Sequence, residues 1–161
     1  MVRLLYMPGA GNTKKMAEAI TAALPDGDWA MEEITIDTEL KPADLYIIGF
    51  GIRRNTLPYH VLQLLDQLED KQAAFFASGA LGSVDAYRTK IESQLLSFLP
   101  ESCGYRGLFL CAGGLSAEGE DYFLTQLNGN DAALRQLQVQ TLNHPDTEDL
   151  SRLRDFIQEI L

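Results

Sequence analysis

The chain has 161 residues with 23 acidic and 13 basic side chains, which gives a formal net charge of −10. That length predicts one domain over residues 1–161, and a composition of 46% hydrophobic and 22% charged residues argues against disordered, collagen-like and coiled-coil classes. Because the chain lacks the clustered lysines and arginines that neutralise phosphates, we expect neither a nucleic acid nor a membrane as its partner.

Two cysteines, Cys103 and Cys111, are too few and too irregularly spaced for a disulfide framework or a zinc site. The first residues lack the charged, apolar and small-residue regions of an export signal. The longest apolar runs, residues 45–52 and 73–82, fall short of the roughly 18 residues that span a bilayer. We therefore expect a cytoplasmic protein with its cysteines reduced.

The first third of the chain predicts strand, helix, strand and strand. Residues 2–6 are apolar and of strand length, and a turn rich in proline and glycine separates them from a helix that opens at Thr13. Residues 29–36 form a second strand whose alternation slips in phase, as a bulge or an edge position allows. The apolar run of residues 45–49 is typical of a parallel strand buried on both faces, so we expect it near the sheet centre.

The middle of the chain repeats this order. A loop over residues 50–57 leads to a helix with Pro58 in its first turn, the position that proline favours. Residues 73–77 form a fourth strand, and the glycine-rich loop of residues 78–83 leads to a helix over residues 84–99, whose apolar residues recur at helical spacing.

The last third predicts a fifth strand, residues 107–112, and a final helix behind a cap at Asp146. The segment between them, residues 115–143, is more polar. It predicts two short helices, 118–127 and 131–137, with a turn between them. Two interpretations of this segment stay open: an element that docks a partner, and a spacer.

Strands that alternate with helices predict an α/β protein, a three-layer sandwich around a parallel sheet. In such sheets the ligand binds outside the carboxyl ends of the strands. The loops at that edge are residues 7–13, 50–57 and 78–83, and we expect the functional site among them.

The first of these loops has the character of an anion site. Gly9 and Gly11 permit positive φ and close approach, and backbone N–H groups at the start of a helix point toward one place. Thr13 can cap the helix and donate its hydroxyl. The spacing of a nucleotide-binding P-loop is absent, because Asn12 follows the last glycine where that motif has lysine. The alternative is a tight turn that binds nothing.

The chain resembles the flavodoxin-like family, and within it the short single-domain members. The resemblance rests on residues 11–20, on Gly49-Phe50 at the end of the third strand, on the glycine-rich loop after the fourth strand, and on residues 143–146. It covers nearly the whole chain. It implies a five-stranded sheet in the order 2-1-3-4-5, noncovalently bound FMN, and electron transfer between partner proteins.

The resemblance also implies which residues bind the cofactor, with no catalytic acid, base or nucleophile and no metal. The phosphate loop and the residues that flank the isoalloxazine ring are Gly9, Ala10, Gly11, Asn12 and Thr13, then Phe50, Gly51, Ile52, Arg53 and Arg54, and finally Ser78, Gly79 and Ala80.

Two departures from the family pattern concern this site. Pro8 and Ala10 stand where the family has hydroxyl side chains, which removes two donors to the phosphate. Arg53 and Arg54 have three possible roles: they replace these donors, they stack on the ring, or they remain solvated. Gly51-Ile52 stands where an aromatic residue commonly covers the flavin. An aliphatic Ile52 would exclude water and disfavour the anionic reduced flavin, which lowers its potential.

Other aromatic and titratable residues have simpler interpretations. Tyr59 and Tyr87 fit helix faces that pack on the sheet, although either can reach the ring. Both cysteines suit the core better than a phosphatase site, since no arginine follows at the required spacing. His60 and His144 each lack sequence partners for a metal.

Three functions therefore remain. The first is an FMN-binding electron carrier, whose acidic surface would dock on the basic surface of a redox partner protein, although the charge also suits solubility alone. The second is a flavodoxin-fold module that has lost tight FMN binding and regulates or binds another protein. The third is a small FMN-dependent reductase. The sequence leaves the oligomeric state open.

Overall fold

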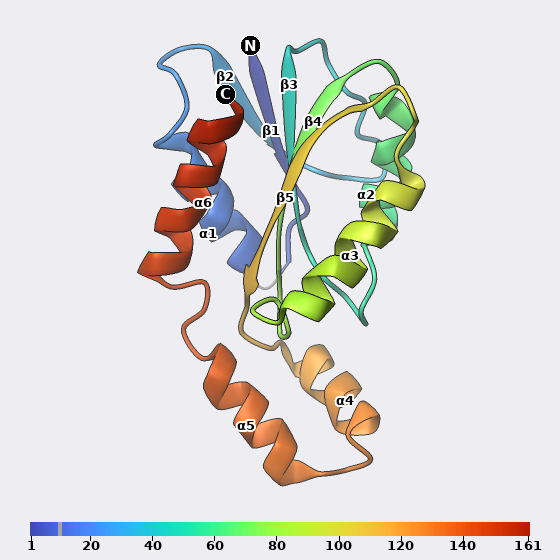
Figure 1. Ribbon diagram of the computed structural model, residues 1–161, viewed down its shortest axis with the longest axis vertical. Helices are drawn as coiled ribbons and strands as arrows, with labels where there is room; N and C mark the ends of the chain where they lie inside the picture. Colours follow the sequence, from blue (N-terminus) through green and yellow to red (C-terminus); the bar gives the residue numbers. More distant parts are fainter. Residues whose placement is uncertain (10) are drawn as a thin grey trace.

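Figure 1 shows the computed structural model, which describes residues 1–9 and 11–161. Over these residues five parallel strands lie in the order β2-β1-β3-β4-β5, which confirms the expected topology. The strands are β1 (Val2–Tyr6), β2 (Trp29–Glu33), β3 (Leu45–Gly51), β4 (Gln72–Gly79) and β5 (Gly104–Ala112).

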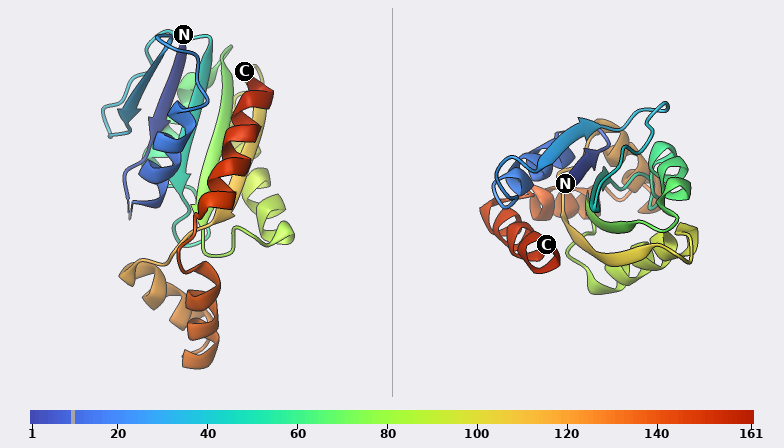
Figure 2. Two further views of the ribbon diagram at one scale, coloured as in Figure 1. Left: turned by 90° about the vertical axis from the view of Figure 1, so that its left-hand side faces the viewer. Right: turned by 90° about the horizontal axis from the view of Figure 1, so that it is seen from above.

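Helices cover both faces of the sheet, so the predicted three-layer sandwich is confirmed. One face carries α1 (Asn12–Thr21) and α6 (Thr147–Ile160), which lie side by side. The other carries α2 (Tyr59–Leu65), the short 3-10 helix η1 (Asp66–Leu68) and α3 (Asp85–Phe98). Two further helices, α4 (Ala117–Gln126) and α5 (Asp131–Thr141), lie beyond the carboxyl ends of the strands (Figures 1 and 2).

The core lies on the two faces of the central strands β3 and β4. Successive side chains of β3 point to opposite faces, as strand geometry requires. Tyr46, Ile48 and Phe50 pack in the cluster under α2 and α3, whereas Leu45 and Ile47 pack in the cluster under α1 and α6. Burial on both faces explains why the sequence of this strand is apolar without alternation.

Two strands run further toward the site than predicted. Phe50 and Gly51 continue β3, because they pair with Ala77 and Ser78 of β4. Ser78 and Gly79 in turn pair with β5, so β4 also extends by two residues. The predicted loops over 50–57 and 78–83 therefore begin two residues later, and the first two residues of each belong to the rigid sheet edge.

The outer strands differ from their predicted ranges as well. β2 is an edge strand, as its pattern allowed, but it ends at Glu33 instead of residue 36, and a turn closed by hydrogen bonds between Thr35 and Thr38 follows it. β5 begins three residues earlier than predicted. Its pairing with β4 shifts register between Ala73 and Phe75, near Gly107 with its φ of 126°. Sequence alternation cannot reveal such a shift.

The helices that pack on the sheet agree with prediction within a few residues. α1 begins at Asn12, and Pro58 is the residue that precedes α2. The predicted helix over 84–99 is correct in place, but two of the apolar residues assigned to its buried face are exposed. Val84 is 47% exposed and Phe98 51% exposed, and the buried face of α3 consists of Ile91 and Leu95.

The segment after β5 forms a helical hairpin. α4 and α5 contact each other and are joined by a turn in which Asn128 and Gly129 have positive φ, as the polar sequence there predicts. Both predicted helices are present, and α5 is longer than expected. None of the α4 residues is fully buried. Within the described residues, no helix combines the length and apolar character needed to cross a bilayer.

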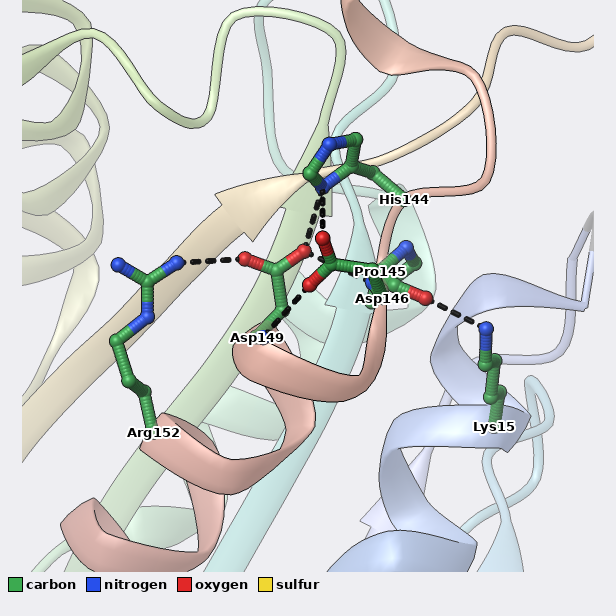
Figure 3. A network of polar contacts seen from close by, with 6 residues as sticks. All are labelled: Lys15, His144, Pro145, Asp146, Asp149 and Arg152. Carbon is green, nitrogen blue, oxygen red and sulfur yellow. Dashed lines mark hydrogen bonds and ion pairs between the residues drawn. The ribbon is translucent and has the colours of Figure 1, made fainter.

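The start of α6 is held by a buried carboxylate (Figure 3). The Asp146 side chain accepts from the Asp149 amide, and the Asp149 side chain accepts from the Asp146 amide, each at 2.9 Å, which is a reciprocal capping box. Asp149 is only 3% exposed, and it also accepts from Arg152 at 2.8 Å. His144 Nδ1 lies 2.6 Å from Asp149 Oδ2. Burial acts to raise the pKa of Asp149, but the hydrogen bonds outweigh burial and hold this pKa below its usual value.

The partners of His144 correct the interpretation of this residue as isolated. His144, Asp146 and Asp149 offer ligand atoms within 4.8 Å of one another. The arrangement is explained by helix capping, because the Asp149 oxygens already accept from His144, Arg152 and a backbone amide. Lys15 of α1 donates to the carbonyl of Pro145, which follows a cis peptide bond. These contacts join the exit of the hairpin to α1 and α6.

The Asp149 carboxylate should stabilise the fold in a pH-dependent way. We expect Asp149→Asn to lower the free energy of unfolding at pH 7 by about 1.5–3 kcal/mol, since the charged hydrogen bonds to a buried group are lost. The folded-state pKa lies below the unfolded value of about 3.9, so the stabilisation is present above that value and is lost as the pH falls through the lower folded-state pKa. Urea unfolding of both proteins from pH 7 to pH 2.5 measures the difference, which should narrow below about pH 4.

Asp146→Asn is the matched control, because asparagine caps a helix about as well as aspartate does. Its cost should stay below about 0.5 kcal/mol. An Asp149→Asn effect that is equally large at every pH would contradict the role given to the charge.

Candidate functional site

A cavity of about 440 Å³ opens at the carboxyl edge of the sheet. Four segments line it: the loop between β1 and α1, the residues after β3, the end of β4, and the segment from Gly113 into α4. The first three are the loops at which the sequence predicts a site. The fourth, which includes the first half of α4, was not assigned to the site.

The start of α1 forms the polar end of this cavity. Gly11 precedes the helix with a φ of 94°, a conformation that side chains disfavour, and its carbonyl accepts from the Lys15 amide. In the described structure no side chain caps α1, and its first turn holds no acidic residue. The backbone N–H groups of the first turn are thus free of competing carboxylates, and Thr13, which is 4% exposed, lines the cavity beside them.

A tight turn after β3 presents two arginines at the rim. Arg53 and Thr56 exchange two backbone hydrogen bonds, at 3.1 and 2.9 Å, around Arg54 and Asn55. Both central residues have positive φ, 49° and 61°, which is the conformation of the two-residue turns that match strand twist. Asparagine tolerates positive φ well and arginine tolerates it poorly. Of the two central residues, only Asn55 is therefore a residue from which the sequence would predict this turn.

Glu118 of α4 is paired with both arginines. Its two carboxylate oxygens lie 3.5 Å from Arg53 Nη2 and 3.7 Å from Arg54 Nη2, and all three side chains are more than half exposed. Such exposed pairs contribute about 0–1 kcal/mol each, so the arginines remain able to exchange partners. Arg53 and Arg54 each form an ion pair with Glu118, which links the turn to α4.

The far side of the cavity depends on the close approach of three chain segments. A Cβ atom added to Gly113 would lie 3.0 Å from Asn12 Nδ2 and 3.0 Å from Ser78 Cβ, so only glycine fits there without displacement. Asn12 Nδ2 donates to the Gly114 carbonyl at 3.3 Å. The Asn12 side chain is therefore engaged with the segment after β5.

Most of the predicted site residues line this cavity. Gly9, Asn12, Thr13, Gly51, Ile52, Arg53, Arg54, Ser78, Gly79 and Ala80 do so. Gly11 shapes the turn beside it, and Ala10 lies outside the described residues. Phe50 does not line the cavity, because its position in β3 turns its side chain into the core, where it is 0% exposed. Ile52 packs against Gly79, whose added Cβ would lie 3.1 Å from Ile52 Cδ1.

Sequence reasoning missed the contribution of α4. Leu115 and Ser116 line the cavity just before α4, and Ala117, Glu118, Gly119, Tyr122 and Phe123 line it within the helix. Gly119, Tyr122 and Phe123 are spaced three and four residues apart, as on one face of a helix, and this spacing was the available signal. It was hidden because the same residues belong to a segment dominated by acidic side chains. Those acids have a local explanation, since Glu118 and Glu120 lie in the first turn of α4, where negative charge is favoured.

The buried thiol of Cys111 and the half-buried phenol of Tyr87 stay neutral at physiological pH. Burial raises the pKa of Cys111 to about 12, which fits its predicted role as a core residue and not a nucleophile. Cys103 is only partly buried. Burial, and then the neighbouring Tyr122, raise the pKa of Tyr87 to about 12. Tyr87 packs on the core as one of its two interpretations proposed, and its hydroxyl donates to Asn55 of the turn at 2.8 Å.

The comparison with known families decides what this architecture is. A family model described as a flavodoxin domain matches residues 3–158. The chain belongs to the flavodoxin family. Among solved structures, a short-chain flavodoxin associated with a bacterial microcompartment is 14% identical, with a TM-score of 0.60 over 99% of this chain and 95% of that one. A flavodoxin from the domain Archaea is 16% identical, with a TM-score of 0.57 over 99% and 94% of the two chains.

A third similar structure is a flavoprotein from Lactobacillus acidophilus NCFM, which was solved in complex with FMN. It is 18% identical, with a TM-score of 0.53 over 68% of this chain and 91% of that one. At these low sequence identities, the similarity to these three structures shows a shared fold alone. The search of curated proteins found no match.

The packing around Gly113 in this flavodoxin-family protein can be tested with two neighbouring glycines. We expect Gly113→Ala to be less stable than Gly114→Ala by about 1–3 kcal/mol, because its added methyl group meets Asn12 and Ser78 at 3.0 Å. The methyl of Gly114→Ala would meet only backbone oxygens at 3.8 and 3.9 Å, which is ordinary contact. Since neither glycine has a positive φ, backbone strain does not separate them. Urea unfolding of the two variants measures the difference, and equal stabilities would show that the segments are looser than described.

Proposed function

We propose that this protein binds FMN noncovalently at the cavity and carries electrons between partner proteins. The observation that carries the proposal is an open cavity at the carboxyl edge of a flavodoxin-family sheet, with the start of α1 at one end of it. A cavity closed by a side chain would favour the alternative of a module that has lost FMN binding.

The polar end of the cavity fits a phosphate. The first turn of α1 offers backbone N–H groups and a positive dipole end, and the Thr13 hydroxyl lies next to them. Pro8 has no N–H, so it contributes no donor. The acidic side chain among the described lining residues is Glu118, and its charge is opposed by Arg53 and Arg54. An anion therefore meets donors at α1 without an unopposed carboxylate.

The rest of the cavity fits a flat, largely apolar ring. Gly51, Ile52, Gly79 and Ala80 offer small or aliphatic surfaces along the sheet edge, and α4 faces them. FMN supplies the redox chemistry when it is bound. The chain holds the cofactor, orients it and excludes water. The apolar contact at Ile52 disfavours negative charge on the reduced ring, which would lower its potential.

The lining supports a carrier over a reductase with its own proton chemistry. Where the lining is described, it contains no histidine, cysteine, lysine or aspartate. The free cysteines of the chain are Cys103 and Cys111, and a reducing compartment such as the cytoplasm suits them. The net charge of −10 suits a redox partner with a basic docking surface.

The phosphate contact can be tested by comparing FMN with riboflavin, which has the same ring and no phosphate. We expect the protein to bind FMN more tightly than riboflavin. Thr13→Val removes a hydroxyl worth about 1.5–3 kcal/mol to a charged group, so it should weaken FMN binding by about 10- to 150-fold and leave riboflavin binding unchanged. Fluorescence titration of each flavin measures both affinities.

Thr21→Val is the control for this substitution, because Thr21 lies on the same helix and is outside the cavity. Its flavin affinities should equal those of the original protein. Failure to bind FMN at millimolar concentration would overturn the proposed function. Equal affinity for FMN and riboflavin would place the phosphate elsewhere.

The acidic surface should appear in the salt dependence of electron transfer. We expect the reduced protein to pass electrons to a basic c-type cytochrome more slowly as ionic strength rises, because salt screens the attraction. Transfer to ferricyanide, an anion, should become faster for the same reason. Stopped-flow rates at several salt concentrations measure both, and rates to the cytochrome that do not change with salt would contradict charge-guided docking.

A further inference from the structure

The aromatic surface of the cavity comes entirely from α4. Among the described lining residues, the aromatic side chains are Tyr122 and Phe123. The sheet-edge loops supply glycine, alanine and isoleucine instead, and Phe50 points into the core. The family pattern places an aromatic residue near the end of the third strand. In this chain the corresponding surface is aliphatic, and the aromatic surface lies on the helical hairpin.

The side chains of α4 that line the cavity are only partly buried by the protein itself. Tyr122 and Phe123 are half-buried, and no residue of the helix is fully buried. The two rings form an edge-to-face pair with centroids 5.4 Å apart and planes at 78°. Gly119, one turn earlier, also lines the cavity and adds no side chain to fill it. A flat ring within the cavity would therefore complete the burial of this face.

The turn after β3 holds α4 at two places on the same face. Asn55 Nδ2 donates to the Tyr122 hydroxyl at 3.0 Å, and Asn55 Oδ1 accepts from the Tyr87 hydroxyl at 2.8 Å. Gln94 of α3 donates to the Asn55 carbonyl at 3.2 Å. One helical turn before Tyr122, Glu118 pairs with Arg53 and Arg54. The turn thus connects α4 to α3 and fixes the Tyr122 ring beside the cavity.

From these contacts we propose that helix α4 supplies the aromatic contact to the isoalloxazine ring, through Tyr122 and Phe123, with Asn55 as the residue that positions Tyr122. The inference rests on the proposed FMN binding. It gives the hairpin a role in binding the cofactor, which is neither of the roles, partner docking or spacer, that the sequence leaves open. The contact is to the ring and not to the phosphate, so its loss must affect FMN and riboflavin alike.

The experiment measures FMN and riboflavin affinities of Tyr122→Leu and Phe123→Leu, together with the residual fluorescence of the bound flavin. Loss of a stacked aromatic ring weakens binding by about 5- to 150-fold. We expect that loss for one or both variants, by the same factor for both flavins. Bound flavin should also fluoresce more strongly, because a nearby aromatic ring quenches it. This pattern differs from that of Thr13→Val, which acts on FMN alone.

Two exposed aromatic residues outside the cavity give matched controls. Tyr59→Leu on α2 and Phe98→Leu on α3 make the same chemical changes at side chains that are 66% and 51% exposed. Both should bind and quench flavin as the original protein does. Urea unfolding of all four variants identifies any that fail to fold.

Tyr122→Phe separates the ring from its hydrogen bond. It keeps the ring and removes the oxygen that accepts from Asn55, so we expect most of the quenching to remain with a smaller loss of affinity. If Tyr122→Phe binds as weakly as Tyr122→Leu while its bound flavin is quenched as in the original protein, the hydroxyl and not the ring is responsible, and the inference is wrong.

The failure of this inference is distinguishable from failure of the proposed function. A protein that binds neither flavin overturns both. A protein that binds FMN, and whose two leucine variants match it in affinity and fluorescence, keeps the proposed function and overturns the role of α4.

Discussion

Parallel pairing of buried strands is the constraint on which the rest of the structure depends. β3 lies between β1 and β4 with nearly all of its side chains buried, so its backbone polar groups must be paired with both neighbours. Parallel strands end at the same edge, and this brings the starts of three connections together there. The start of α1, the arginine turn and the end of β4 meet at one cavity for this reason, although they are far apart in the sequence.

Local sequence was sufficient to predict the strands and helices that are marked by apolar periodicity or by a helix cap. The apolar run in β3, the helical spacing around Ile91 and Leu95, and the cap at Asp146 each led to a correct element. What could not be predicted depends on pairing or on distant contacts. Phe50 belongs to the strand only because Ala77 lies opposite it. His144 has partners only because α6 begins three residues later and brings the Asp149 side chain next to it.

The site shows the same division. Glycines, Thr13 and the loops at the sheet edge were found because family pattern and backbone chemistry both indicate them. The contribution of α4 was missed, because helical spacing in residues 115–123 does not indicate where the hairpin lies relative to the strand ends. Its aromatic pair became visible only when the cavity showed which face of the helix is turned inward.

The hairpin leaves and rejoins the sandwich at nearly one point. The Gly114 amide donates to the His144 carbonyl at 3.0 Å, so the two ends of the intervening segment lie next to each other. The sandwich on either side is complete without it, since β5 and α6 each pack on their own neighbours. Residues 115–143 are therefore connected to the sandwich in such a way that another segment with adjacent ends could replace them. Recombination at this position would give one flavodoxin scaffold a different helical hairpin beside the same sheet edge and the same start of α1, without rebuilding the sheet.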